Sequence, residues 1–550
     1  MPQRYLRFFI FSLLSGNAAF AQPVVNVLGP VNAASYRTSG LPGSGIARGS
    51  MFSLFGTDLG PQSPTWAYSF PLPTTLGGSS GTSVSVTVGN TTASAILLFA
   101  SSVQINAILP SSVPAGTGTL TVTNGSQTSA PVPIHVVDSA FGIFAYNSAG
   151  TGQAIATDVN YQLNTIIHTF HPGDSVILWG TGLGPISASD AEAPPAGDVG
   201  DAITMHIGNS TAPVSYHGRA PCCAGLDQIV FSIPANIAGC HVPVGVETSG
   251  GVSNIGTIAI SQSGQVCSDS LLGQDLVNNL ASGHKVRFGL VRLESYLTRR
   301  AGQSGADTAV ATFSELSPDA AGLAQYGVSS GYCVAVDCSW GCNSSQGAAF
   351  SLSLYDSSPS QLDAGSLSVQ GDSTVALTRY GGPYAAVLSS QNGARFLWTN
   401  HSYAVNGTGG ADVGAFSPTE TAGKLSAQFT NLTDNQSVPR SSDLNLEWTG
   451  GDPSLQNGQV TIGGLSATSD FSNLQVFQCT APLAPHQFTI PAWVLSTLPP
   501  SGSYAIGSPP WAIGFVWIGQ SNTPVTFNPA GLDRAILTDI FYNRAEVNFQ

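Results

Sequence analysis

An internal repeat organises the first half of this 550-residue chain. Residues 49–61, which read GSMFSLFGTDLGP, return 124 positions later as residues 173–185, GDSVILWGTGLGP. The same offset relates residues 104–110, QINAILP, to residues 228–234, QIVFSIP. Ordered matches at one fixed offset indicate two copies of a single structural unit, so any fold assigned to this half must occur twice.

Each copy has the periodicity of half-buried strands. Ile105, Ala107 and Leu109 alternate with other residues, and the second copy repeats this alternation. Residues 83–88 alternate Ser or Thr with Val. Such a period of two places the apolar side chains on one face of a sheet. The segments 49–61 and 173–185 both end in Gly-Thr-x-Leu-Gly-Pro, where glycine permits positive φ and proline ends strand pairing. The pattern predicts antiparallel β-sandwiches.

Several short motifs resemble a secreted bacterial domain family that occurs as paralogous sets, with modules similar to IPT/TIG domains. The motifs are NAASY at 32–36, FGTDLG at 55–60, QIN at 104–106 and PAG at 114–116. The resemblance covers about residues 24–265. It implies immunoglobulin-like sandwiches in an extracellular, modular protein with a binding or architectural role, and it transfers no catalytic residue. Asp58 becomes Gly182 in the second copy, so Asp58 is not expected to be an indispensable ligand.

The remainder of the chain lacks the repeat but again shows strand-like runs and glycine-rich turns. Residues 271–280 predict one short helix, with leucines four residues apart on one face. The predicted fold class is all-β, with tandem immunoglobulin-like sandwiches followed by a further β-rich region. The predicted organisation is a signal peptide at 1–21, sandwiches at 22–138 and 139–265, a connector at 266–284, and β-rich units at 285–422 and 423–550. If Cys479 pairs across residue 422, the last two units are expected to act as one block.

Composition excludes some classes of partner. Charged residues make up only 8% of the chain, the formal net charge is −14, and Lys285 and Lys424 are the two lysines. An acidic chain without basic clusters repels phosphate backbones and anionic lipid, so neither nucleic acid nor a membrane surface is an expected partner. The 63 glycines and 35 prolines accompany 42% hydrophobic residues, which favours short strands over disorder.

The first 21 residues have the features of an export signal. Arg4 and Arg7 precede a short apolar run at 8–14, and Ala19-Phe20-Ala21 is a small-x-small cleavage site. The mature chain is therefore expected to begin near Gln22. A membrane anchor needs about 20 apolar residues, and this run is shorter. We expect a secreted or cell-surface protein that does not insert into the membrane after signal removal.

Export makes disulfides the expected state of the cysteines. Each of the two groups of four allows three pairings. In the first group, Cys222 and Cys223 are adjacent, and we expect them to reach Cys240 and Cys267 in some order rather than each other. The spacing in the second group matches no common zinc pattern. The disulfide candidates are Cys222, Cys223, Cys240, Cys267, Cys333, Cys338, Cys342 and Cys479.

No motif in the sequence assembles a catalytic, cofactor or metal site. Gly-x-Ser-x-Gly occurs at 77–81 and at 327–331, around Ser329, but without the strand before and the helix after that a hydrolase needs. Acidic residues crowd the loop at 190–201, yet their spacing is not that of a calcium loop. The histidines form no ligand cluster.

Six of the eight tryptophans lie in the second half. Trp448 and Trp517 belong to alternating or continuous apolar runs, so we expect them in the core. Trp340 and Trp511 are the candidates for an exposed ligand face. The sequence therefore predicts a non-enzymatic extracellular structural, adhesion or binding protein, whose partner is an extracellular polysaccharide or another cell-surface protein.

Two alternatives stay open. The first is a carbohydrate-binding protein or accessory module that uses the C-terminal aromatics. The second is a secreted hydrolase with an unrecognised site. In all three readings, the specific function is expected in the second half of the chain, because that half carries most tryptophans and lies outside the repeat.

Overall fold

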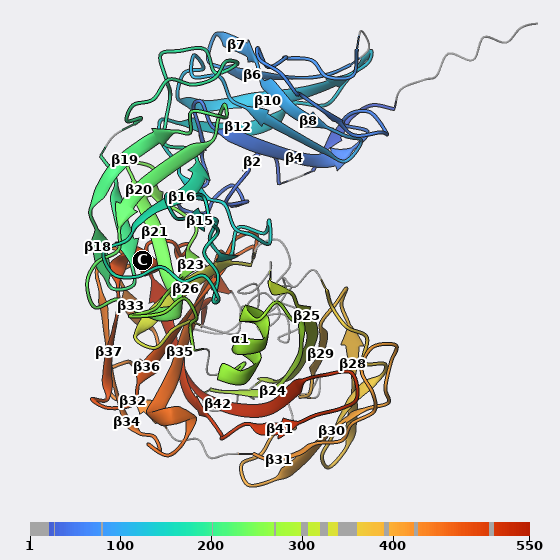
Figure 1. Ribbon diagram of the computed structural model, residues 1–550, viewed down its shortest axis with the longest axis vertical. Coiled ribbons are helices and arrows are strands. Elements are labelled where there is room, and N and C mark those ends of the chain that lie inside the picture. The colour runs from blue at the N-terminus through green and yellow to red at the C-terminus, as the bar shows by residue number, and fades with distance from the viewer. Residues whose placement is uncertain are drawn as a thin grey trace, which may run out of the picture.

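The computed structural model describes residues 21–550 except 27, 79–80, 201, 269–270, 299–305, 319–327, 339–359, 390–394, 423–426 and 505–510. The described chain is almost entirely β-structure and follows an arc (Figure 1). The first sandwich lies at one end of this arc, the second sandwich lies in the middle, and the C-terminal region lies at the other end. The predicted all-β fold class is confirmed. Residues 1–20 of the predicted export signal lie outside the described residues.

The first sandwich packs two sheets around one core. Its first sheet contains β1 (Val24–Val25), β2 (Val31–Asn32), β4 (Met51–Thr57), β5 (Thr65–Trp66), β8 (Ile96–Ala100) and β9 (Gln104–Ile108). Its second sheet contains β3 (Ile46–Ala47), β6 (Thr82–Val88), β7 (Thr91–Ser94), β10 (Gly116–Asn124), β11 (Gln127–Thr128) and β12 (Val132–Val137). Val84, Val86 and Val88 are buried between the sheets, as their alternation predicts.

The second sandwich has the same construction. One sheet contains β13 (Gly142–Ile143), β15 (Ala156–Thr157), β16 (Ser175–Thr181), β19 (Val214–Arg219) and β20 (Asp227–Ser232). The other contains β14 (Gly152–Gln153), β17 (Thr204–Ile207), β18 (Ser210–Ala212), β21 (Gly239–Thr248), β22 (Gly251–Val252) and β23 (Gly256–Ile260).

The repeat reproduces strand register as well as strand identity. β4 pairs antiparallel with β9, so that Phe55 lies opposite Gln104. β16 pairs antiparallel with β20, so that Trp179 lies opposite Gln228. Both partners are displaced by the same 124 positions. Because a one-residue slip would turn every side chain to the other face, the shared register places equivalent residues on equivalent faces.

The shared glycine before each bend has a steric cause. A Cβ on Gly56 would lie 2.0 Å from the carbonyl oxygen of Val24, which belongs to the neighbouring strand β1. A Cβ on Gly180 would lie 2.3 Å from the carbonyl oxygen of Gly142 in β13. In both copies a strand crosses at a distance that only glycine allows.

The C-terminal region is built on a curved 14-stranded sheet (Figure 1). In sheet order, its main path is β26 (Tyr332–Asp337), β36 (Leu474–Pro482), β35 (Gln459–Ala467), β40 (Gly514–Ser521), β42 (Arg534–Phe549), β24 (Val286–Thr298), β25 (Ala306–Leu316), β29 (Tyr384–Val387), β28 (Thr374–Arg379), β27 (Leu367–Gln370), β30 (Ser402–Gly407) and β31 (Thr419–Thr421). β33 (Gln436–Val438) and β41 (Val525–Phe527) also pair with β42.

Smaller elements cover this sheet. They are the three-stranded sheet of β32 (Ala427–Phe429), β34 (Leu444–Gly450) and β37 (Gln487–Ile490), the pair β38 (Ser503–Tyr504) and β39 (Trp511–Ala512), the short helix α3 (Ala492–Leu495) and the 3₁₀ turn η3 (Gln456–Gly458). The predicted connector helix is present as α1 (Gln274–Ala281). Its Leu276 and Leu280 are buried with Phe288 of β24. Within the described residues, no helix is long and apolar enough to cross a membrane.

The two separate C-terminal units predicted at 285–422 and 423–550 are not separate in this sheet. β24 from the first unit pairs in parallel with β42 from the second over eleven residue positions. β26 pairs with β36 across the same boundary, and the Cys333–Cys479 disulfide joins these two strands. The expected division at residue 422 therefore falls inside one continuous sheet.

A buried ion pair joins the two sandwiches. The guanidinium of Arg219, at the end of β19, contacts the carboxylate of Asp227 at the start of β20, and both side chains are fully buried. Arg219 also donates to the carbonyl oxygens of Gly49 in the first sandwich, at 2.8 Å, and of Gly184 in the second, at 2.6 Å. The other carboxylate oxygen of Asp227 accepts from the backbone N–H groups of Gly182 and Leu183. One cation thus spans the junction.

A loop of the first sandwich makes a second contact between the parts of the chain. Arg37 is buried and donates to the carbonyl oxygens of Val252 and Ser253 in the second sandwich. Thr38 donates to the side-chain oxygen of Asn473 in the C-terminal region at 3.0 Å. Burial lowers the pKa of Arg37 to about 10, so its charge is retained at neutral pH. The loop therefore contacts all three parts of the chain.

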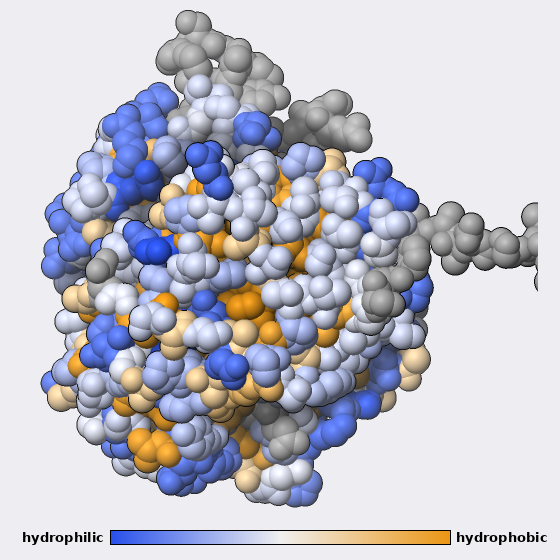
Figure 2. All heavy atoms as spheres, turned by 90° about the horizontal axis from the view of Figure 1, so that it is seen from above, coloured by the Kyte–Doolittle hydropathy of each residue, from blue (hydrophilic) through white to orange (hydrophobic). Residues whose placement is uncertain are grey.

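The surface reflects the low charge of the sequence. Seen from above, residues of intermediate hydropathy cover most of the visible face, and strongly hydrophilic residues are scattered (Figure 2). This appearance follows from a chain rich in Gly, Ser and Thr with 8% charged residues.

The junction ion pair generates the first prediction. Arg219→Ala removes the cation and leaves the buried Asp227 carboxylate uncompensated, which is expected to cost about 3–5 kcal/mol of unfolding free energy. Asp138→Ala is the control, because the Arg48–Asp138 pair is exposed and such pairs contribute about 0–1 kcal/mol. Urea denaturation of the full chain measures both. Equal, small losses in the two variants would contradict the assigned role of Arg219.

A carboxyl pair in the large sheet generates a pH prediction. Glu420 and Asp539 are both buried, and Glu420 accepts one hydrogen bond from Asn522 at 3.3 Å. Burial, followed by the charge of Asp539, raises the pKa of Glu420 to about 7. The folded state therefore favours the protonated form. This contribution to stability is complete below pH 4.5, the unfolded value, and is lost as pH rises through 7.

Glu420→Gln should accordingly remove part of the loss of stability between pH 5 and pH 8. At pH 8 we expect the variant to exceed the natural chain by about 1–3 kcal/mol, because glutamine carries no charge to bury. Thermal unfolding of both proteins across this range gives the difference. A variant that is less stable at pH 8 than at pH 5 by as much as the natural chain would contradict the assignment.

Candidate functional site

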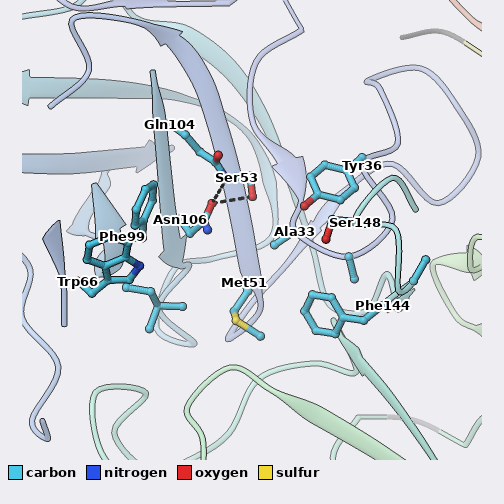
Figure 3. Close-up of a pocket in the computed structure, with 13 residues that line it drawn as sticks. Ala33, Tyr36, Met51, Ser53, Trp66, Phe99, Gln104, Asn106, Phe144 and Ser148 are labelled. Carbon is cyan, nitrogen blue, oxygen red and sulfur yellow. Dashed lines mark hydrogen bonds between the residues drawn. The ribbon is translucent and has the colours of Figure 1, made fainter. Parts of the chain in front are cut away.

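A pocket of about 420 Å³ opens on the outer face of the β4–β9–β8 sheet, where the first sandwich meets the second (Figure 3). Trp66 and Phe99 form one wall, with ring centroids 5.2 Å apart and planes tilted by 55°. Tyr36 and Phe144 lie on the opposite side. Phe144 belongs to the second sandwich, so the pocket exists only while the two modules keep their relative position.

The floor between these walls is polar. The side-chain oxygen of Asn106 accepts from Gln104 at 2.9 Å and from the Ser53 hydroxyl at 3.0 Å (Figure 3). Both bonds use the oxygen of Asn106, which fixes the orientation of its amide. Among the described residues, its amide nitrogen has no hydrogen-bond partner. A ligand in the pocket can therefore accept a hydrogen bond from it.

A second pocket, of about 890 Å³, adjoins the first and shares Phe144, Ala145 and Ser148 with it. Four aromatic residues line it, and two of them, Tyr161 and Trp179, have ring centroids 6.2 Å apart. The indole N–H of Trp179 donates to Thr157 at 3.1 Å, which holds the ring in place. We call the two adjoining pockets the inter-module groove.

The two pockets are related by the sequence repeat. Tyr36 and Phe55 lie 6.3 Å apart with a 39° tilt, and Tyr161 and Trp179 lie 6.2 Å apart with a 35° tilt. The strand register places one glutamine opposite each second ring: Gln104 lines the first pocket and Gln228 the second. Each pocket is thus lined by a corresponding tyrosine and a corresponding glutamine. Trp179 also lines the second pocket, whereas its counterpart Phe55 packs near Tyr36 without lining the first.

Both tyrosines have an unusual backbone. Tyr36 has φ of 54° and Tyr161 has φ of 64°. Positive φ is rare for a bulky residue other than glycine, and such strained conformations concentrate at functional sites. The occurrence of this conformation at corresponding positions of both copies points to the groove as a site of function.

The groove is lined without any charged side chain. Its polar groups are amides and hydroxyls, and its remaining lining is apolar or aromatic. Burial raises the pKa of Tyr36, so its hydroxyl stays neutral at physiological pH. A neutral lining in a chain of net charge −14 favours an uncharged ligand over an ionic one.

The cysteines at the groove correct one expectation. Cys222 and Cys223 bond to each other, and Cys240 bonds to Cys267. The reason lies in the sheet arrangement, because β21 pairs with β23 and brings Cys240 within a Cα distance of 5.5 Å of Cys267. The Cys222–Cys223 pair instead lies in the turn between β19 and β20, and Cys222 lines the second pocket.

The other predicted cysteines lie in the C-terminal region. Cys333 and Cys479 are directly opposite each other in register and form a disulfide. Cys338 is also disulfide-bonded. Cys342 lies outside the described residues.

The predicted ligand-face tryptophans do not form a described site. Trp340 lies outside the described residues, and Trp511 lies in β39 with a side chain that the structure does not describe. Trp448 and Trp517 are buried, as predicted. Trp493 stacks on His206 of the second sandwich, with centroids 5.0 Å apart and planes 9° apart. It therefore contributes to the contact between the second sandwich and the C-terminal region.

Ser329 has a structural contact instead of a catalytic one. Its hydroxyl accepts from the backbone N–H of His241 at 2.9 Å, and strand β26 follows it where a hydrolase needs a helix. The Gly-x-Ser-x-Gly motif at 77–81 lies partly outside the described residues. In the acidic loop, the carboxylate of Asp190 accepts from the backbone and hydroxyl of Ser111, so it bridges the two sandwiches. The described residues contain no cluster of three metal-ligating side chains.

Sequence reasoning missed the groove, although the signal for half of it was present. Tyr36 is the last residue of the NAASY motif at 32–36, and Trp179 lies in the repeated segment 173–185. Tyr161 corresponds to Tyr36 at an offset of 125 residues, so the 124-residue repeat does not align the two tyrosines. Trp66 and Phe144 belong to segments without internal similarity, and only the packing of the modules brings them together.

A protein-family comparison supports the fold assigned to the first sandwich. The family model described as IPT/TIG domain matches residues 39–136, which lie in the first sandwich. No curated protein matches the chain. Similar solved structures include domains 5–6 of the S-layer protein SbsC, with 12% identity, 44% of this chain and 100% of that chain covered, and a TM-score of 0.16. Immunoglobulin domains 1–4 of Sidekick-1 match with 11% identity, 95% and 99% coverage, and a TM-score of 0.14.

The family match identifies the first module as an IPT/TIG-like immunoglobulin sandwich. The register shared by β4–β9 and β16–β20 gives the second module the same construction. Modules of this kind serve structural or binding roles, and the chain is of that general class.

Proposed function

We propose that this chain is a non-enzymatic extracellular binding protein whose ligand occupies the inter-module groove. The observation that carries the proposal is the duplicated, uncharged aromatic lining of two adjoining pockets. Both pocket volumes fall in the range of about 300–1,000 Å³ that is usual for ligand sites. The disulfides support an extracellular location, because such bonds persist in oxidising compartments.

The groove has the parts of a binding site but lacks those of a catalytic one. A hydrolytic site needs a nucleophile with a base, or a pair of carboxylates, or a metal. The side chains that line the groove supply aromatic rings, amides, hydroxyls and the Cys222–Cys223 disulfide. Such groups can orient and hold a ligand without activating water.

A purely structural role is the second candidate. The buried contacts of Arg219, Arg37 and Thr38 hold the three parts of the chain in one arrangement, as a structural array needs. This role does not require exposed rings such as Trp66, which is 47% exposed. We therefore favour a binding role over a purely structural one.

Binding to a panel of insoluble extracellular polymers, both polysaccharides and proteins, tests the proposal. The natural chain should co-sediment with at least one polymer, and Trp66→Ala or Tyr161→Asn should reduce the bound fraction at least about tenfold, because anchor aromatics dominate binding energy. Asparagine is chosen at Tyr161 because it tolerates positive φ.

Two controls match these variants in exposure. Trp398 is 44% exposed and Tyr68 is 86% exposed, and neither lines the groove. Trp398→Ala and Tyr68→Asn should bind as the natural chain does. Absence of binding to every polymer, or binding that the groove variants leave unchanged, would refute the proposed function.

A further inference from the structure

We infer that the ligand of the groove is a neutral polysaccharide chain of flat, gluco-configured sugar rings, and that it runs through both pockets. This inference rests on the proposed function and adds the chemical class and the extent of the ligand. It follows from three properties of the groove: its rings, its neutrality and its duplication.

The aromatic rings suit the faces of sugars. The face of an aromatic ring carries partial negative charge. A gluco-configured pyranose places its hydroxyls at the ring edge and presents C–H groups of partial positive charge on its faces. Trp66 in the first pocket and Tyr161 in the second are exposed enough to receive such a face. Stacking would leave the sugar hydroxyls at the edge free for hydrogen bonds.

The polar groups of the groove suit hydroxyls. Among the described residues, the side-chain amide of Gln228 and the amide nitrogen of Asn106 make no hydrogen bonds. An amide offers both a donor and an acceptor, which matches a hydroxyl group that also does both. A charged ligand would find no counter-charge here, since neither pocket is lined by Asp, Glu, Lys, Arg or His.

The duplication suits a ligand that repeats. Two pockets with a corresponding tyrosine and a corresponding glutamine, each beside further aromatic rings, present similar chemistry twice. They share Phe144, Ala145 and Ser148, so one continuous chain can pass from the first to the second. A homopolymer offers the same unit to each pocket, whereas a folded protein surface or a single small molecule does not.

The alternative occupant of an aromatic groove is a proline-rich peptide, which docks on such surfaces in extended form. The side-chain amide of Gln228 favours the glycan, because its oxygen can accept from a sugar hydroxyl, whereas a polyproline segment has carbonyl acceptors but no backbone N–H donor. The peptide is retained as an arm of the test.

The test is calorimetric titration of the full chain with β-1,4-linked gluco-oligosaccharides of two to eight units. Affinity should rise with length until both pockets are filled. Trp66→Ala and Tyr161→Asn should each reduce affinity for the longest oligosaccharide by about 10²-fold, to near that of the shortest, because one of two linked contacts is lost. Trp398→Ala and Tyr68→Asn should retain the affinity of the natural chain.

Two further arms check the class of ligand. Affinity should be the same at about 50 mM and about 500 mM sodium chloride, because no charge pairing is involved. A carboxylated oligosaccharide and a proline-rich peptide should bind at least about tenfold more weakly than the neutral oligosaccharide.

The outcomes separate the inference from the proposed function. Groove-dependent binding of the peptide or of the carboxylated sugar in preference to the neutral oligosaccharide would overturn the inference and leave the proposed function standing. Affinity that does not change with length, or that responds to only one of the two groove variants, would overturn the two-pocket extent. No groove-dependent binding to any arm or polymer would refute both.

Discussion

The contact on which the rest of the arrangement depends is the Arg219 guanidinium, buried between the two sandwiches. It reaches Gly49 of one module, Gly184 of the other and the Asp227 carboxylate. A buried guanidinium tolerates little displacement, since each lost hydrogen bond leaves a buried N–H group without an acceptor in a medium of low dielectric constant. The junction is therefore rigid where a flexible linker would be usual between modules. This rigidity allows Phe144 of the second module to complete a pocket that opens mainly on the first.

Because the two modules are repeats, the junction between them brings two similar pockets side by side. Each module carries the same pairing of strands, and the equal register places equivalent rings and glutamines on equivalent faces. Two modules on a flexible linker would present two independent weak sites. Held by Arg219 and by the loop of Arg37, the same pockets adjoin and share lining residues. In the proposed function, one elongated site thereby combines residues of both immunoglobulin-like modules.

The sequence predicts the local structure of this chain well and its long-range pairing poorly, for physical reasons. Alternation at residues 83–88 and 105–109 marks buried strand faces, because side-chain direction in a strand depends only on local backbone geometry. No local pattern relates β24 to β42, which pair across more than two hundred residues, so the sequence does not show that the predicted units at 285–422 and 423–550 share one sheet. The Cys222–Cys223 bond is equally invisible, because it depends on a turn between two strands. The groove lies between these cases: its repeated half is present in the sequence, while Trp66 and Phe144 join it only through module packing.

The central claim is that one rigid junction turns two repeated pockets into a single site for a neutral glycan chain. A crystal structure of the full chain with a gluco-oligosaccharide of six or more units measures this most directly. The account predicts continuous density for one sugar chain that passes through both pockets, with rings stacked on Trp66 and Tyr161. Density in one pocket alone, or at the C-terminal region with the groove empty, would contradict it.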